Sequence, residues 1–202
     1  MDALRSLAAD HRLIRRTLDA FDVYIGYVEA RVPVDRFDLQ RFVAFFQDFA
    51  DVYHHDKEEA LLFPALVAAG LDWNGDPLAR IRREHDQEHY LMSSLEHSGL
   101  QGDAWSEDER RHFLGVAKEF VAFQRAHMRF ENTEVFPCAE RVLSEFTRAQ
   151  LTRDVRRFDD AAGSRKIRAI ELAEVLERRY SSNDGSPCEG TNRMDRHLAG
   201  PR

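Results

Sequence analysis

One stretch of the chain reads HHDKEEALLFP over residues 54–64, and a later stretch reads HMRFENTEVFP over residues 127–137. Histidine, glutamate, phenylalanine and proline occupy the same positions in both. Residues four apart lie close together on one face of an α-helix, so each stretch presents an imidazole and a carboxylate to one spot. That spacing is typical of metal ligands on a helix. The two stretches therefore predict a helical repeat that carries His54, Glu58, His127 and Glu131 as candidate metal ligands.

A further histidine precedes each stretch by nearly the same interval: His11 precedes the first and His85 the second. At about 1.5 Å per residue, counted from turns near Pro33 and Gly70, the first three histidines reach one level of a bundle. His127 reaches that level if the loop before the fourth helix spans roughly 10 Å along the bundle axis, which about eight residues can do. Four histidines and two glutamates are thus expected to converge among apolar side chains. Buried carboxylates are costly there unless they are paired or bind a cation.

Apolar residues recur at alternating spacings of three and four along four segments, as on the buried face of a helix. The expected helices cover about residues 4–28, 35–69, 78–95 and 106–130. Gly99 and Gly102 close the third helix, and Ser106 with Glu109 forms a capping box for the fourth. Four long helices joined by short loops predict an all-α, up-down-up-down four-helix bundle.

Beyond Pro137 the apolar pattern weakens into shorter helices, expected at about residues 140–160 and 165–180 with Gly163 between them. The last stretch combines serine, glycine, proline and scattered charge, so it cannot offset its ordering entropy by burial. This organisation predicts a bundle domain over residues 1–140, appended helices over 141–180 that pack on it, and a disordered tail over 181–202.

Composition argues against several classes of function. The chain is 43% hydrophobic and 32% charged with 10 glycines and 6 prolines, too apolar for disorder and too poor in turn residues for an all-β fold. A net charge of −7 and a pI near 5.7 argue against nucleic acid or an anionic membrane as the partner. No apolar stretch reaches membrane-spanning length, no export signal is visible, and Cys138 and Cys188 lie far apart. We expect a cytoplasmic protein.

The sequence resembles the hemerythrin or HHE cation-binding domain. The resemblance rests on His11, the pair His54 and Glu58 with the Leu-Phe-Pro after it, His85, and the pair His127 and Glu131, and it covers roughly residues 3–140. It implies two non-haem iron ions, oxo- or hydroxo-bridged, with Glu58 and Glu131 between them and the four histidines completing both sides. Imidazole and carboxylate suit iron, and zinc stays an alternative because such sites bind it more tightly than ferrous iron.

The chain departs from the oxygen-carrying members at two positions. These members have an aspartate five residues after the last histidine, where this chain has Asn132, which cannot supply an anionic ligand. They also carry two histidines four apart on the third helix. Here His89 follows His85 at that spacing and is either a seventh ligand or a neighbour of the site; its counterpart in the repeat, Arg15, favours the second. The pattern is therefore closer to relatives tied to peroxide, nitric oxide or iron sensing than to oxygen carriers.

Four neighbouring residues also have side chains that could bind a metal or orient its ligands. His55 and Glu59 repeat the histidine–glutamate spacing one residue on, but a rotation of about 100° places them on the rim. Asp86 and Glu134 either orient ligands or lie in solvent as ordinary surface charges.

Two functions of different classes fit this set of residues. The first is a di-iron protein that binds or decomposes a small oxidant (O2, H2O2 or NO), with catalase-like peroxide decomposition as one version. The second is an iron, oxygen or redox sensor without turnover, whose C-terminal region would contact a partner protein. A ferritin-like oxidase is a weaker third, because that design uses Glu-x-x-His pairs and the spacing here is reversed. The sequence does not specify the oligomeric state.

Overall fold

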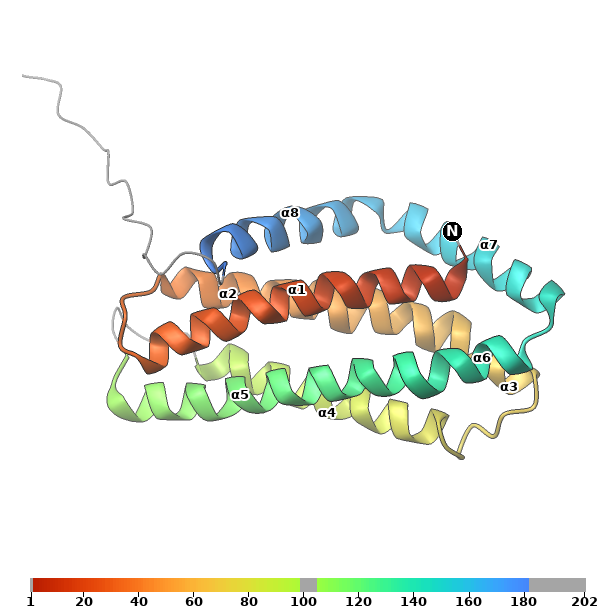
Figure 1. Cartoon of the computed structure of the whole chain (residues 1–202), viewed down its shortest axis with the longest axis horizontal. Coiled ribbons are helices and arrows are strands. Elements are labelled where there is room, and N and C mark those ends of the chain that lie inside the picture. Colours follow the sequence, from red (N-terminus) through yellow and green to blue (C-terminus); the bar gives the residue numbers. More distant parts are fainter. Residues whose placement is uncertain (1, 99–104, 182–202) are drawn as a thin grey trace, which may run out of the picture.

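The computed structural model describes residues 2–98 and 105–181, and every regular element in these ranges is a helix. Four helical segments lie side by side in the expected up-down-up-down bundle (Figure 1). The first and third are α1 (Ala3–Glu29) and α4 (Leu78–Ser98). The second consists of α2 (Arg36–Phe45), η1 (Phe46–His55), η2 (Glu58–Leu62) and α3 (Phe63–Ala68), and the fourth of α5 (Glu107–Phe130), η3 (Glu131–Val135) and α6 (Phe136–Val142). The predicted fold class is confirmed.

Helices α1, α2 and α5 begin where the sequence supplies capping side chains. Asp2 accepts a hydrogen bond from the Leu4 amide, and Asp35 accepts one from the Phe37 amide. Ser106 and Glu109 form the predicted capping box at the start of α5. Such caps satisfy amides that a helix leaves without intrahelical partners. Gly99, Gly102 and residues 182–202, for which a helix end and a disordered tail are expected, lie outside the described residues.

The second and fourth bundle segments both contain π-helical turns beside the candidate ligands. In η2 the amide of Phe63 donates to the carbonyl of Glu58, and in η3 the amide of Phe136 donates to the carbonyl of Glu131. A proline follows each donor, and its missing N–H interrupts the regular hydrogen-bond ladder. Single π-helical turns inside α-helices are frequently found at functional sites. The repeat in sequence is therefore also a repeat in backbone geometry.

Two apolar clusters fill the bundle on either side of a polar layer. The larger cluster contains most of the buried phenylalanines, among them Phe21, Phe46 and Phe120. The smaller contains Phe63 and Ile81 from the other end of the same helices. Burying a side chain of this size contributes about 1.5–3 kcal/mol, so these clusters dominate the stability of the bundle. Within the described ranges, no helix combines the length and apolar character that crossing a membrane requires.

Two further helices, α7 (Glu145–Ala161) and α8 (Gly163–Arg179), lie along the bundle on the side of α1 and α2 (Figure 1). Leu176 of α8 is buried in the larger apolar cluster, and Leu151 of α7 is buried in the smaller one. At the end of α8, Arg179 and Tyr180 both donate hydrogen bonds to the buried carboxylate of Asp38 in α2. Apolar burial and a charged contact therefore both hold this helical pair on the bundle.

Candidate metal centre

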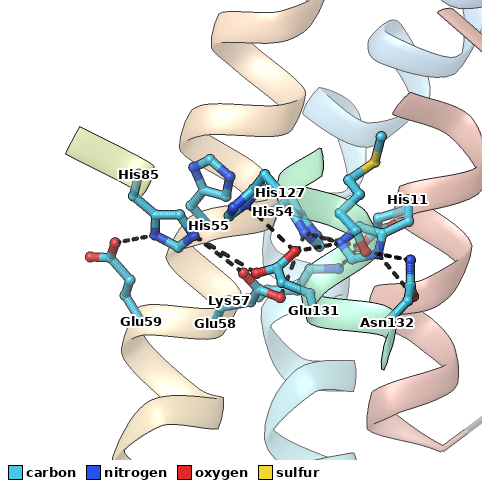
Figure 2. Close-up of polar contacts among 12 residues, drawn as sticks. His11, His54, His55, Lys57, Glu58, Glu59, His85, His127, Glu131 and Asn132 are labelled. Atoms are coloured by element: carbon cyan, nitrogen blue, oxygen red, sulfur yellow. Dashed lines mark hydrogen bonds and ion pairs between the residues drawn. The ribbon is translucent and has the colours of Figure 1, made fainter. Parts of the chain in front are cut away.

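The bundle brings all six predicted ligand residues together in its polar layer (Figure 2). His11 comes from α1, His85 from α4 and His127 from α5, while the other three come from the π-helical turns. All six side chains are buried, and the carboxylates of Glu58 and Glu131 are fully so. The convergence arises because the four segments cross this layer at matching heights.

Each glutamate lies between histidines of different helices. Glu131 oxygens lie 3.0 Å from Nε2 of His11, 3.5 Å from Nε2 of His127 and 3.9 Å from Nε2 of His85. Glu58 oxygens lie 3.6 Å from Nε2 of His54 and 3.6 Å from Nε2 of His85. Both carboxylates are therefore close to imidazoles from opposite sides of the layer.

The donor atoms form two groups, each with all its atoms within 4.8 Å of one another. One group contains His11, His54, Glu58 and Glu131. The other contains three imidazoles, those of His55, His85 and His127. Two compact groups of nitrogen and oxygen donors could each hold one metal ion, and the two glutamates are close to both.

The expectation that His55 lies on the rim is wrong. Its side chain is 4% exposed, and its ring stacks on that of His85 with centroids 3.8 Å apart. Because η1 is π-helical up to His55, its wider turn reduces the rotation between successive residues, so His54 and His55 both point inward. Only the backbone hydrogen-bond pattern reveals this. Glu59 lies at the surface as expected, with 49% of its side chain exposed.

His89, the alternative seventh ligand, lies outside both groups. Its side chain is 76% exposed, and its Nδ1 lies 3.1 Å from Asp51. In the described structure His55, rather than His89, brings a third imidazole to His85 and His127.

Polar side chains outside the layer orient the imidazoles. His85 donates from Nδ1 to Glu59 at 2.6 Å, and His127 donates from Nδ1 to Glu84 at 3.0 Å. His11 donates from Nδ1 to the Asn132 carbonyl oxygen at 3.2 Å. A hydrogen bond at Nδ1 fixes the ring and leaves Nε2 with its lone pair toward the interior.

Sequence reasoning missed the carboxylates that make these contacts. Glu84 adjoins His85 in sequence but serves His127 on the next helix, and spacing within one helix cannot reveal such a contact. Asp86 and Glu134, which the sequence allowed in this role, are both exposed. Asn132 supplies no charge to the layer but holds His11 in place.

A buried polar pair, Gln124 and Glu88, adjoins the group of three imidazoles. Gln124 donates from Nε2 to Glu88 at 2.9 Å, and the other oxygen of Glu88 lies 3.4 Å from Nε2 of His55. Burial raises the pKa of Glu88 to about 7, against the opposing effect of the neighbouring histidines. Neither Glu88 nor Gln124 belongs to the repeated pattern, so the spacing of the candidate ligands does not predict this pair.

The electrostatics of the layer act in opposite directions on His85 and His55. Burial opposes the charged form of His85, but the nearby carboxylates of Glu131, Glu58 and Glu59 outweigh it and raise the pKa to about 12. Burial and the charge on His85 instead hold the pKa of His55 well below its ordinary value. A neutral imidazole has a free lone pair, which is the form that binds a metal.

The layer also contains buried polar atoms without hydrogen-bond partners. Among them are both carboxylate oxygens of Glu58 and of Glu131, and Nε2 of His85 and of His127. Buried polar groups are nearly always paired, so a cluster of unpaired acceptors indicates a missing partner. A metal cation satisfies carboxylate oxygens and imidazole nitrogens together, and this donor set suits iron or zinc. The residues present therefore fit a metal centre.

Comparison with known families agrees with this chemistry. The family model described as the hemerythrin HHE cation binding domain matches residues 2–139. No curated protein and no solved structure gives a significant match to the chain. The match covers all four segments that cross the polar layer.

Proposed function

The chain belongs to the hemerythrin HHE cation-binding family, and on that premise we propose that it holds two non-haem iron ions and acts on a small oxidant (O2, H2O2 or NO). One observation carries the proposal: two donor groups share a layer in which Glu58 and Glu131 each approach imidazoles of both groups. Carboxylates in that position are suited to bridge a metal pair.

The proposed ligands follow the two groups. His11 and His54 would hold one ion, His85 and His127 the other, and the two glutamates would be shared. We add His55 as the third imidazole of the second ion, because both of its ring nitrogens are buried without hydrogen-bond partners. The first position would then keep fewer protein ligands than the second.

The chain's own residues would prepare the centre for its ligand. Glu59, Glu84 and Asn132 hold imidazoles by their Nδ1 atoms, which keeps the Nε2 atoms aimed inward. The buried phenylalanines on either side exclude water from the layer. Bound iron would supply the redox chemistry, exchanging electrons with the oxidant. Zinc has none, so a near-ultraviolet spectrum of the purified chain distinguishes ferric iron from zinc.

Metal content tests the proposal. Elemental analysis should find two iron ions per chain, and replacing both Glu58 and Glu131 by alanine should remove them. The matched control replaces the exposed Asp86 and Glu134 by alanine and should keep both ions. A single ion in the unchanged protein, or two ions that survive loss of both buried glutamates, would contradict the proposal.

Peroxide tests the reaction. Hydrogen peroxide added to the ferric protein should release oxygen, and Glu131→Ala should abolish the release. Reversible uptake of oxygen by the ferrous protein, without peroxide turnover, would instead identify a carrier.

A sensor without turnover is the second candidate, and one set of contacts favours it. Asp159 of α7 lies 3.2 Å from the buried ammonium of Lys57, which contacts Asp10, and Asp10 lies 3.7 Å from Nδ1 of His54. The appended helix thus reaches a candidate ligand through two side chains. If metal binding is sensed this way, hydrogen exchange in α7 should quicken when iron is removed, while unchanged exchange would argue against a sensor.

A further inference from the structure

A cavity of about 550 Å3 opens between α1 and α5 beside the metal centre. Four arginines line it, Arg12 and Arg15 from α1 and Arg125 and Arg129 from α5. His11 and Asn132 line it as well, so the cavity reaches a candidate metal ligand and the residue that orients it. We call this cavity the arginine hollow.

Three of the four guanidinium groups in the arginine hollow have no carboxylate partner among the described residues. Within residues 2–98 and 105–181, the guanidinium groups of Arg15 and Arg129 form no ion pair or hydrogen bond, and that of Arg12 donates only to the Ala8 carbonyl at 3.1 Å. Arg125 alone has carboxylate partners, Asp19 at 2.7 Å and Asp22 at 2.6 Å. Three cationic groups without carboxylate partners around one cavity are notable in a chain of net charge −7.

The position of His11 connects the arginine hollow with the centre. One ring nitrogen of His11 contacts Asn132 in the hollow, and the other lies 3.0 Å from the buried carboxylate of Glu131. A molecule in the hollow is therefore separated from the buried glutamates by a single imidazole. This is also the side on which the proposed centre has two imidazoles rather than three.

We propose that the arginine hollow is a binding site for a small oxyanion beside the metal centre. Guanidinium groups pair with oxyanions through parallel hydrogen bonds, and several of them around one cavity favour a compact anion over a neutral molecule. This proposal rests on the residues of the arginine hollow and does not require metal ions at the centre.

The test is calorimetric titration of the iron-loaded, full-length protein with inorganic phosphate in a low-salt buffer. We expect saturable binding, and we expect Arg15→Gln and Arg129→Gln each to weaken it about tenfold or more, because each removes a charge-assisted hydrogen bond. Arg16→Gln is the matched control on α1: its guanidinium is paired with Glu177 outside the hollow, so phosphate affinity should not change. All three positions are at the surface, and these variants should fold normally.

The outcomes separate this proposal from the proposed function. If the iron-loaded protein binds no phosphate, the proposal for the arginine hollow is wrong, while the proposed metal centre is unaffected. Binding that is equally strong in the Arg15 and Arg129 variants would also overturn it, because the anion would then bind elsewhere. Phosphate binding that depends on both arginines, in a preparation that holds no iron, would support the hollow and count against the proposed function. A titration with phenyl phosphate distinguishes the source: affinity equal to that of phosphate supports a phosphate monoester as ligand, and weaker affinity supports the free ion.

Discussion

The ammonium group of Lys57 lies 3.2 Å from the carboxylate of Asp159, and the Lys57 side chain is fully buried. Lys57 belongs to the second bundle segment and Asp159 to α7, so this contact joins the bundle to its C-terminal helices. The same ammonium contacts Asp10, whose carboxylate is itself buried. One lysine thus contacts two carboxylates, one of which adjoins His54.

Lys57→Met should lower the free energy of unfolding by about 3 kcal/mol, because it leaves the buried Asp10 carboxylate with only the more distant ammonium of Lys166. Urea denaturation measures the loss. Lys166→Met is the control: Lys166 approaches the same two aspartates at 3.9 Å and 3.6 Å but is 31% exposed, and its loss should be about 1 kcal/mol or less. Equal losses in the two variants would show that burial of Lys57 does not govern the effect.

His85, His55 and His89 should differ in their importance for iron binding. His85→Ala and His55→Ala should each weaken iron binding at least about tenfold, since each removes a proposed ligand whose side chain is buried. His89→Ala should leave iron content and absorption nearly unchanged, because the His89 side chain is exposed and its Nδ1 is directed to Asp51 outside both donor groups. Iron content and visible spectra check this. If His89→Ala proved as damaging as His85→Ala, the assignment of His55 would be wrong.

The carboxylates that hold the imidazoles should tune metal affinity without binding metal. Glu84→Gln and Glu59→Gln keep the shape of each side chain but weaken the hydrogen bond to Nδ1, so iron affinity should fall about 10- to 100-fold. Competition with a chelator measures the change. Glu134→Gln, exposed and without such a contact, is the control and should keep full affinity. Unchanged affinity in Glu84→Gln would mean that the ring of His127 is held by packing alone.

Protonation of Asp38 at acidic pH should lower the free energy of unfolding. Burial would raise its pKa, but hydrogen bonds from Tyr180, Arg179 and Arg41 outweigh burial and lower the pKa below 3.8. A carboxylate whose pKa is lower in the folded state adds stability above its unfolded pKa, and that stability is lost as the pH falls through the folded pKa. Asp38→Asn should therefore cost about 2 kcal/mol near neutral pH, with the difference shrinking as the pH falls below the unfolded-state pKa of 3.8. Denaturation at both pH values checks this, and a difference independent of pH would rule out the charge as its cause.

The sequence alone determined the features that depend on local periodicity. The three-and-four spacing of apolar residues predicted four amphipathic helices, and the capping residues Asp35 and Ser106 lie where α2 and α5 begin. Matched intervals between His11 and His54, and between His85 and His127, predicted that distant residues would meet at one height. Such inferences succeed because helix rise and rotation per residue are nearly constant.

Only the tertiary structure decided two kinds of feature. These are side-chain orientations that depend on departures from regular α-helix geometry, and contacts between different helices. His55 turned inward because η1 is π-helical, and the rotation assumed for an α-helix placed it on the rim. Glu84, Lys57 and Asp159 act on residues of other helices, so their partners depend on how the helices are rotated against one another. Spacing within one helix carries no information about that rotation, which packing of the whole bundle sets.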